Sequence, residues 1–225
     1  MSYEKFADLI KSRSLFCSRL DKLSDALEGL LSAGNCRTMS PVTAALHNGY
    51  DIKDDCDQQL LQSAHMRRVY FVNCWHINDS ESKTMWRLYA PRPESVVVVS
   101  RVVKLCAYGR ICRQRGIGQM IVSKVKYADF DYPRPDWVSW GPALIKDLPY
   151  RVEREIRLLA TPNCSPERAA NLDCFKIPLD PRLLIEAVIL HPHAYSGFCQ
   201  AVRELSRKHL PHVPVAASTI TSHLW

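Results

Sequence analysis

The stretch YRVEREIRLL, residues 150–159, carries two glutamates one position apart and then runs into apolar residues. In an extended strand, the residues at positions i and i+2 point to the same face. Glu153, Glu155 and Arg157 would therefore share one face, and the opposite face is mostly apolar and suits the core. The pattern predicts a strand over residues 152–160, which we take as the centre of the sheet.

The shared face of Glu153 and Glu155 allows three interpretations. Alternating Arg and Glu on one face of a strand is common on a solvated surface. In a cleft, by contrast, a carboxylate can stabilise a cationic transition state or bind a ribose hydroxyl. The third interpretation is a buried ion pair with Arg157 or Arg151, in which the charges are structural. The residues alone leave all three open.

The rest of the chain shows helical spacing in some segments and runs of β-branched residues in others. Helices are expected over residues 3–13, 22–31, 54–67, 81–89 and 197–209. Further strands are expected over residues 14–18, 69–75, 95–100, 119–129, 173–179 and 184–192. No repeat or linker divides the chain. We therefore expect a single α+β domain over residues 1–225. Its mixed, mostly antiparallel sheet would have about six strands with flanking helices.

The charge balance is basic. Lys and Arg together number 30 against 23 Asp and Glu, which gives a net charge of +7. Part of the excess lies in RVVKLCAYGRICRQR, residues 101–115. A basic surface attracts the phosphates of a nucleotide or of a nucleic acid. A solvated basic face is the plainer interpretation.

The nine cysteines are scattered, odd in number and without a CxxC spacing. This pattern predicts reduced thiols rather than a disulfide framework or a structural zinc site. No apolar run reaches about 18 residues, so no membrane span is expected. The first residues lack the basic region and apolar core of a secretory signal. We expect a cytoplasmic protein with no metal site.

Aromatic residues gather in NCWHINDSESKTMWRLY, residues 73–89. A strand would end near Trp75, and a helix would open near Ser80 after a polar turn. The N-terminus of such a helix can bind an anion. Trp75, Trp86 and Tyr89 can wall a pocket for a planar ring, or they can simply pack into the core.

Six segments, taken in order, resemble a known family. They are KFADLIKSRSLFCSRLDKLSDALEG, VNCWHINDSESKTMWRLYA, KVKYADFD, PYRVEREIRLL, IEAVILHP and PVAAST. Over nearly the whole chain they resemble the bacterial domain-of-unknown-function family 2971. The combination of Cys-Trp, Glu-Ser, Met-Trp and Tyr with the later Glu-x-Glu-x-Arg carries the likeness. The resemblance also implies that the family's first strand, which supplies an Arg or His, is missing or truncated here.

The layout of that family is similar to ADP-ribosyltransferase-like folds. In those folds an early strand supplies Arg or His, a middle element supplies Ser or Tyr, and a late strand supplies Glu. By this likeness Tyr89 or Ser100 would be the middle residue, and Glu153 or Glu155 the late one. The resemblance implies NAD as the substrate. The glutamate would stabilise the oxocarbenium-like ribose that forms when nicotinamide leaves.

The same likeness assigns contacts to the cofactor. Trp75 and Trp86 would frame the nicotinamide together with the tyrosine of the site, and Arg19 and Arg87 would contact the phosphates. The alternative function is a non-catalytic nucleic-acid-binding or interaction protein, active in phage defence, that uses residues 101–115. Salt separates the two functions, because binding to a phosphate backbone weakens steeply as salt rises.

Overall fold

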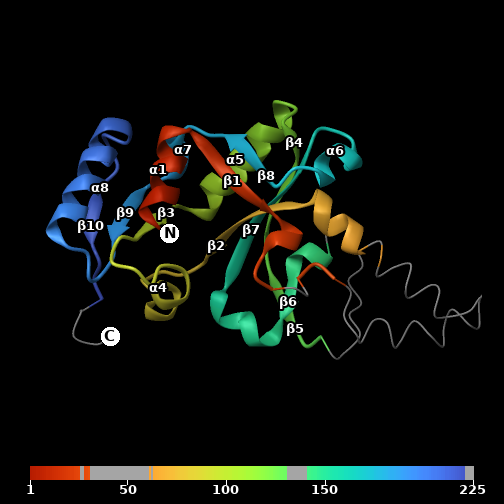
Figure 1. Ribbon diagram of the computed structural model, residues 1–225, viewed down its shortest axis with the longest axis horizontal. Coiled ribbons are helices and arrows are strands. Elements are labelled where there is room, and N and C mark those ends of the chain that lie inside the picture. Colours follow the sequence, from red (N-terminus) through yellow and green to blue (C-terminus); the bar gives the residue numbers. More distant parts are fainter. Residues whose placement is uncertain (26–27, 31–60, 62, 131–140, 221–225) are drawn as a thin grey trace, which may run out of the picture. The chain divides into compact units, whose positions relative to one another are not determined.

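The computed structural model describes residues 1–25, 28–30, 61, 63–130 and 141–220 (Figure 1). The chain divides into two compact units, which are described separately. The first unit comprises Met1–Phe16, Asn78–Cys112 and Lys176–Trp225. The second unit comprises Cys17–Ile77 and Arg113–Phe175.

A five-stranded sheet organises the second unit, with the strand order β4-β7-β2-β1-β8. Its strands are β1 (Ser14–Arg19), β2 (Phe71–His76), β4 (Gly118–Lys124), β7 (Glu155–Pro162) and β8 (Cys174–Pro178). Strand β7 pairs antiparallel with β2 on one side and with β4 on the other. The strand of the opening stretch is therefore internal, as predicted.

Strand β7 begins later than the sequence pattern indicates. A 3-10 helix, η3 (Leu148–Glu153), precedes it, and Arg154 ends this helix in the left-handed conformation with φ of 41°. The turn at Arg154 interrupts the extended backbone. The prediction that Glu153 lies on the same strand face as Glu155 is therefore wrong, because Glu153 is not on the strand.

Both faces of β7 are buried. Ile156 and Leu158 lie on one face, and Glu155 and Arg157 lie on the other. An internal strand with cover on both sides has no solvated face. The alternation of charged and apolar residues, which usually marks a half-exposed strand, here separates a polar core face from an apolar one.

Shorter elements complete the second unit. A parallel pair is formed by β5 (Lys126–Ala128) and β6 (Ile145–Asp147), and the remaining elements are η1 (Leu20–Lys22), η2 (Pro142–Leu144) and α6 (Pro166–Ala170). Residues 63–69 are helical. They include the end of the helix expected over 54–67, most of which lies outside the described residues.

The helix expected over residues 22–31 is not found in the part of that range that the structure describes. Glu28 and Gly29 form a turn, in which Gly29 has a φ of 78°. A Cβ atom at Gly29 would lie 2.6 Å from the Leu20 Cδ2 atom. The positive φ and this close approach both favour glycine, and the turn places Glu28 in the core.

The first unit contains a three-stranded sheet with the order β10-β9-β3. Strand β9 pairs antiparallel with β3 and parallel with β10. The strands are β3 (Val96–Val99), β9 (Ala187–Leu190) and β10 (Val215–Ala217). The helices are α1 (Tyr3–Lys11), α4 (Lys83–Tyr89), α5 (Val102–Gln114), α7 (Pro181–Leu184) and α8 (Ser196–His209).

The α+β class and the mostly antiparallel pairing are confirmed, but the strands fall into three sheets rather than one of about six strands. Helix α5 had no predicted counterpart. Val102, Val103 and Ile111 are exposed on it, so its apolar residues do not mark one buried face. No helix among the described residues is long and apolar enough to cross a membrane. Boundaries between the two units fall inside β1, α5 and β8, so no linker separates the units at these points. The assignment of the chain to a single domain stays a prediction.

Candidate functional site

Five ionisable side chains meet in the interior of the second unit and form what we call the charge cluster. Three are carboxylates and two are cations, and each side chain is at most 10% exposed. They come from the turn before residue 31, from β6, from η3 and from β7. Charged side chains are almost never buried unless they are paired. The cluster consists of Glu28, Lys146, Glu153, Glu155 and Arg157.

Arg157 is the most buried member of the charge cluster, with a side chain that is 0% exposed. Its Nε donates to Glu155 Oε1 at 2.7 Å, and its Nη2 donates to Glu155 Oε2 at 3.0 Å. Its Nη1 donates to the Ala143 carbonyl at 2.6 Å. The guanidinium also forms an ion pair with the Glu28 carboxylate. This bidentate geometry fixes the orientation of the Glu155 carboxylate.

Lys146 joins the three carboxylates. Its Nζ lies 2.6 Å from Glu153 Oε2, 3.7 Å from Glu155 Oε2 and 3.9 Å from Glu28 Oε2. The ammonium also lies 4.6 Å from the centre of the Tyr150 ring. Glu153 is thus connected to Glu155 through a shared cation rather than through a shared strand face.

Burial and pairing act against each other on the pKa values of the cluster. Burial raises the pKa of the Glu155 carboxyl, and the Cys74 hydrogen bond and the Lys146 charge oppose that shift. Burial lowers the pKa of Lys146, but the hydrogen bond to Glu153 and the charge of Glu155 outweigh it, so the value lies above the ordinary one. Burial lowers the pKa of Arg157 to about 9, which leaves the guanidinium charged at neutral pH.

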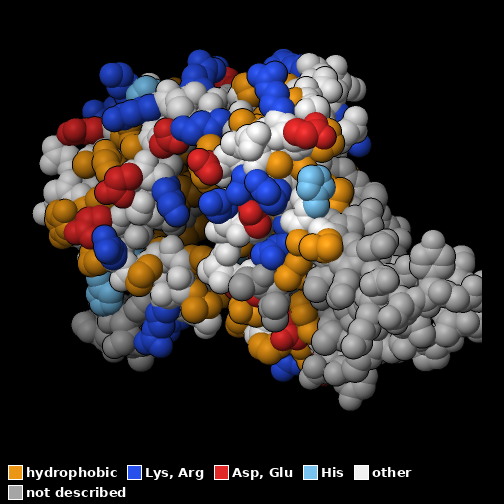
Figure 2. Space-filling model, turned by 45° about the vertical axis from the view of Figure 1, so that its right-hand side comes forward, with side chains coloured by type: hydrophobic (Ala, Val, Ile, Leu, Met, Phe, Trp, Pro, Cys, Tyr) orange, Lys and Arg blue, Asp and Glu red, His pale blue; other side chains and the backbone are white. Residues whose placement is uncertain are grey.

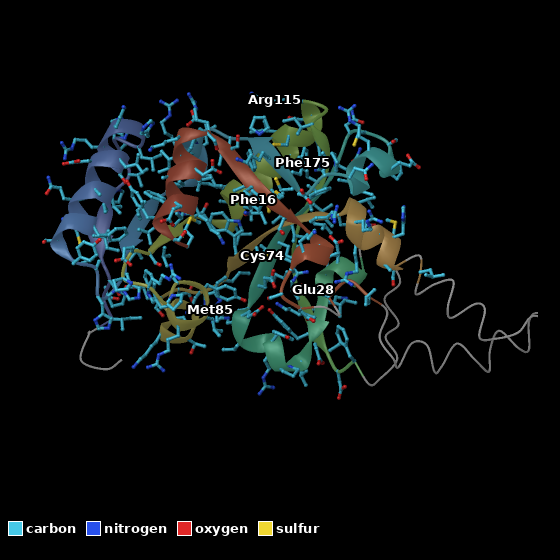
Figure 3. All side chains as sticks on the ribbon, in the orientation of Figure 1. Phe16, Glu28, Cys74, Met85, Arg115 and Phe175 are labelled. Carbon is cyan, nitrogen blue, oxygen red and sulfur yellow. The ribbon has the colours of Figure 1, made fainter. Side chains whose placement is uncertain are left out.

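Cys74 lies next to the charge cluster. Figure 3 labels Cys74 and one member of the cluster, Glu28. It stands opposite Arg157 in the register of β2 and β7. Its side chain reaches solvent. The surrounding protein is nevertheless dense, so desolvation, followed by the charge of Glu155, raises the pKa of the thiol well above its usual range. Cys74 is therefore a protonated hydrogen-bond donor to Glu155 rather than a thiolate nucleophile.

His76 and Tyr127 extend the polar surroundings of Glu155. His76 is the register partner of Glu155, and its Nδ1 lies 2.6 Å from the Glu153 carbonyl oxygen. Its Nε2 is buried and has no hydrogen-bond partner among the described residues. The Tyr127 hydroxyl accepts a hydrogen bond from the Glu155 amide at 2.8 Å. The His76 Nε2 atom therefore has a hydrogen-bonding capacity that no described residue uses.

Sequence reasoning missed most of these neighbours. Cys74 and His76 belong to the segment that we interpreted through its tryptophans. Their positions on either side of Trp75 would have placed both on the strand face opposite that of Trp75. Lys146 and Glu28 carry no local signal, because long-range pairing alone brings them to Glu155.

Two residues of the second unit that were predicted to contact a cofactor have other surroundings. Trp75 pairs with Ile156, so it lies on the sheet face opposite Glu155 and cannot frame a ligand there. Arg19 is buried, with its Nε at 2.6 Å from Asp21 Oδ1 and its Nη1 at 2.6 Å from the Ala170 carbonyl. Arg19 therefore holds the end of α6 in place, which leaves it poorly placed for a phosphate.

Trp86, in the first unit, is a core residue. Its side chain is buried, and its Nε1 donates to Glu81 Oε2 at 3.0 Å. Its ring meets the His191 ring edge to face, with centroids 5.1 Å apart. Glu81 also accepts hydrogen bonds from Ser218 and Thr219. The expected pocket wall is thus a packing contact of α4.

The other predicted residues of the first unit are Ser100, Tyr89 and Arg87. The Ser100 hydroxyl donates to the Leu184 carbonyl at 2.6 Å, which joins the end of β3 to α7. Tyr89 and Arg87 are exposed on α4. Their predicted catalytic and phosphate-binding roles stay predictions.

The basic stretch over residues 101–115 contains the whole of α5. Arg101 Nε lies 2.9 Å from Glu186 Oε2, and Lys104 Nζ lies 3.0 Å from Glu186 Oε1. On the face drawn in Figure 2, Lys and Arg side chains are interspersed with acidic and hydrophobic ones.

Seven cysteines are free within the part of the chain that the structure describes, as predicted for them, and Cys36 and Cys56 lie outside that part. Over the same residues, no group of three or more His, Cys, Asp or Glu side chains could hold a metal ion. The free cysteines are Cys17, Cys74, Cys106, Cys112, Cys164, Cys174 and Cys199.

Comparison of the chain with protein-family models, with curated proteins and with solved structures gave no match. The resemblance to family 2971 therefore rests on the sequence segments alone, and the charge cluster must be interpreted from its own geometry.

Proposed function

We propose that the charge cluster is the catalytic centre of an enzyme that cleaves the glycosidic bond of NAD, of ADP-ribosyltransferase or NAD glycohydrolase type. The observation that carries the proposal is the Glu155 carboxylate itself. It stands at the start of an internal strand, oriented by Arg157, and it accepts a hydrogen bond from the solvent-reaching Cys74.

The cost of burying these charges supports a functional role. Taking a carboxylate out of water costs several kcal/mol, and a well-packed apolar core of similar volume is often as stable or more stable. The cluster holds three carboxylates against two cations, so one negative charge is in excess when all are ionised. Perturbed, coupled ionisable groups of this kind concentrate at functional sites.

The chemistry needs a fixed negative charge. When the bond between ribose and nicotinamide breaks, the electron pair leaves with nicotinamide and the ribose carbon becomes cationic. The Glu155 carboxylate stabilises that cation, and water or an acceptor then adds to it. In this proposal the His76 Nε2 atom bonds a ribose hydroxyl, because His76 is the register partner of Glu155 and its Nε2 has no partner among the described residues.

The proposal includes the setting of the enzyme. We place the chain in the domain-of-unknown-function family 2971 on its sequence segments. We place it in the cytoplasm because the seven cysteines that the structure describes are free. Arg157 and Lys146 are positioning residues here, because they hold the two glutamates rather than touch the substrate.

The test is release of nicotinamide from NAD, followed by proton NMR, for wild type and for Glu155→Gln. The substitution keeps the shape of the side chain but removes its charge. We expect nicotinamide release to fall by about a hundredfold or more, as for other single preorganised electrostatic groups. Glu204→Gln is the matched control, because Glu204 is exposed on α8 and bonds only to Gln200 in the described structure, so full activity is expected.

Circular dichroism at the assay temperature shows whether Glu155→Gln is folded. A folded variant with full activity would show that Glu155 is not catalytic. A wild type that neither binds NAD at millimolar concentration nor releases nicotinamide would overturn the proposal as a whole. Salt-sensitive binding of an oligonucleotide by the same inactive protein would instead favour the nucleic-acid-binding or interaction function, in phage defence.

A further inference from the structure

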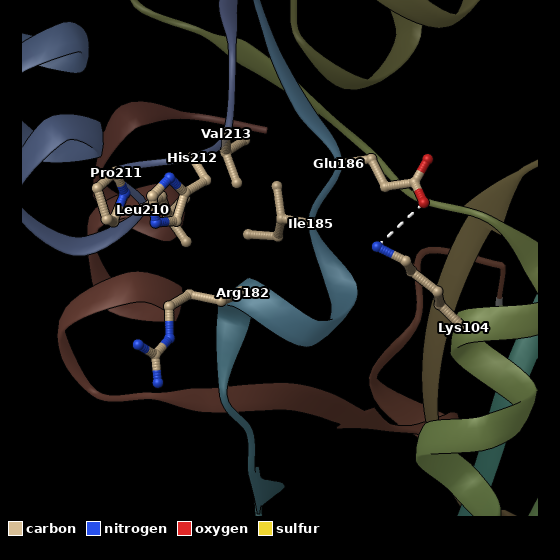
Figure 4. Close-up of a pocket in the computed structure, with 8 residues that line it drawn as sticks. All are labelled: Lys104, Arg182, Ile185, Glu186, Leu210, Pro211, His212 and Val213. Carbon is tan, nitrogen blue, oxygen red and sulfur yellow. Dashed lines mark ion pairs between the residues drawn. The ribbon is translucent and has the colours of Figure 1, made fainter.

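A pocket lies wholly within the first unit, and its lining shares no residue with the charge cluster. Its volume is about 400 Å³, which is within the range of small-molecule sites. Helix α5, the turn from α7 into β9, and the segment between α8 and β10 form its walls (Figure 4). Six of its lining residues carry the argument: Lys104, Arg182, Ile185, Glu186, Leu210 and Val213.

The floor of this pocket is apolar and fixed. Ile185 and Leu210 are almost fully buried, at 2% and 1% exposure. The Ile185 amide donates to the Pro181 carbonyl at 2.8 Å, and the Val213 amide donates to the Leu210 carbonyl at 3.0 Å. Backbone bonds therefore hold these apolar residues, and a ligand would meet mainly Val213, which is half-buried over the covered Ile185 and Leu210.

Lys104 and Glu186 stand on one side of Ile185 and Arg182 on the other, as Figure 4 shows. Glu186 is shared, because Lys104 bonds one of its oxygens and Arg101 bonds the other. The hydrogen bond from Lys104 lowers the pKa of Glu186, so this carboxylate stays ionised. A lysine ammonium has three donors, and Glu186 is the one partner of Lys104 among the described residues. Two donors remain for a ligand.

Arg182 has donors to spare as well. Its Nε and Nη2 bond to Asp180, at 2.9 Å and 2.6 Å. Its Nη1 has no partner among the residues that the structure describes, and its side chain is 58% exposed. Arg13 also pairs with Asp180, at 3.4 Å. Counting Arg101 and Arg13, four cations face two carboxylates around this pocket, which makes it locally positive.

We propose that this pocket binds a small organic anion, with its apolar body against Val213, above the buried Ile185 and Leu210, and its carboxylate or phosphate group held by Lys104 or Arg182. The proposal is independent of NAD cleavage at the charge cluster. An apolar floor with charged donors at its margins matches such a ligand, because the body gains from burial while the anion finds donors that are already desolvated in part.

The test uses benzoate and phenyl phosphate as anionic probes and benzyl alcohol as a neutral probe of similar size. Methyl NMR of the wild type follows the resonances of Ile185, Leu210 and Val213. We expect saturable shifts with both anions and binding of benzyl alcohol that is weaker by about fivefold or more. Tighter binding of phenyl phosphate would assign a phosphorylated ligand, and tighter binding of benzoate a carboxylate.

Two substitutions give effects of opposite sign. Lys104→Met should weaken anion binding by about threefold to tenfold, because a charged donor is lost. Glu186→Gln should strengthen it, because the competing carboxylate is gone. Lys176→Met is the matched control, since Lys176 is exposed and pairs with Asp8 outside the pocket. Equal binding of the neutral and anionic probes, an unchanged affinity in Lys104→Met, or no methyl shift at tens of millimolar would each overturn the proposal.

Discussion

Two arginine–carboxylate pairs in this protein have almost the same geometry and very different surroundings. Arg157 Nε lies 2.7 Å from Glu155, with side chains that are 0% and 6% exposed. Arg182 Nη2 lies 2.6 Å from Asp180, with side chains that are 58% and 22% exposed. The distance between the charges is therefore not what distinguishes the two pairs.

Water distinguishes them. Around Arg182 and Asp180 a high dielectric and dissolved salt screen the attraction, so the pair contributes little to folding. Around Arg157 and Glu155 both the attraction and the desolvation penalty are large. Removing one partner from the buried pair leaves an uncompensated charge, whereas removing one from the exposed pair leaves a solvated side chain. This contrast leads to three measurements.

The largest effect is expected for Arg157→Met. The substitution leaves Glu155 and Glu28 without their guanidinium in a buried site, and loss of one partner from such a pair costs roughly 3–5 kcal/mol. Urea unfolding followed by circular dichroism measures this as a lower midpoint with an unchanged slope. Arg157→Lys should recover only part of the loss, because an ammonium cannot reproduce the bidentate contact. A decrease in the free energy of unfolding below about 1 kcal/mol would mean that the buried pair stabilises the fold no more than a surface pair does.

The intermediate effect is a pH dependence of opposite sign in the two regions. The Asp180 carboxyl has a pKa of about 2, lowered mainly by its hydrogen bonds from Arg182. Its stabilising contribution is present above the ordinary value of 3.8 and is lost as the pH falls toward 2. Burial raises the pKa of Glu155 above 4.5, so its contribution decreases as the pH rises from 4.5 toward the folded value.

Unfolding free energies of wild type, Asp180→Asn and Glu155→Gln, measured across acidic pH, separate these two cases. The difference between wild type and Asp180→Asn should grow with rising pH between about 2 and 4. The difference between wild type and Glu155→Gln should shrink with rising pH above 4.5, at up to about 1.4 kcal/mol per pH unit. Two slopes of the same sign would contradict the assignment of burial as the dominant cause at Glu155.

The smallest effect is expected for Arg182→Met. Solvent screens the attraction between the guanidinium and Asp180, so its removal should lower the unfolding free energy by about 1 kcal/mol or less. The check is the same urea titration at low and moderate salt. A clear destabilisation that persists at moderate salt would show that exposure is a poor guide to the strength of ion pairs in this chain.

The sequence was a good guide where a pattern is local. Helices α1 and α8 and strands β2 and β7 were predicted close to their observed positions, because their apolar spacing is set within a few residues. It was a poor guide to the faces of β7. The alternation of Glu and Arg around Ile156 is what a solvated strand would also show, and only the pairing with β2 and β4 determines that Arg157 is buried.

The candidate site shows the same limit. Glu155 was singled out from the sequence, and a buried pair with Arg157 was among the open interpretations. Lys146 and Glu28 could not be foreseen, because their contacts depend on the return of distant segments to β7. On a solvated surface or in an open cleft, Glu155→Gln would leave the free energy of unfolding almost unchanged. In the buried site, we expect the substitution to lower it by roughly 1–3 kcal/mol.

The internal position of β7 also determines when the sheet can form during synthesis. The last residue of β2, His76, pairs with Glu155 at the start of β7. At about 5–20 residues per second, the ribosome needs on the order of 4–16 s to make the chain between them. Throughout that time the apolar strand from Phe71 lacks one of its two neighbours, and such unpaired strands are prone to aggregate. Production with chaperones that shield extended apolar segments should therefore raise the soluble yield more than changes to the surface of the finished protein.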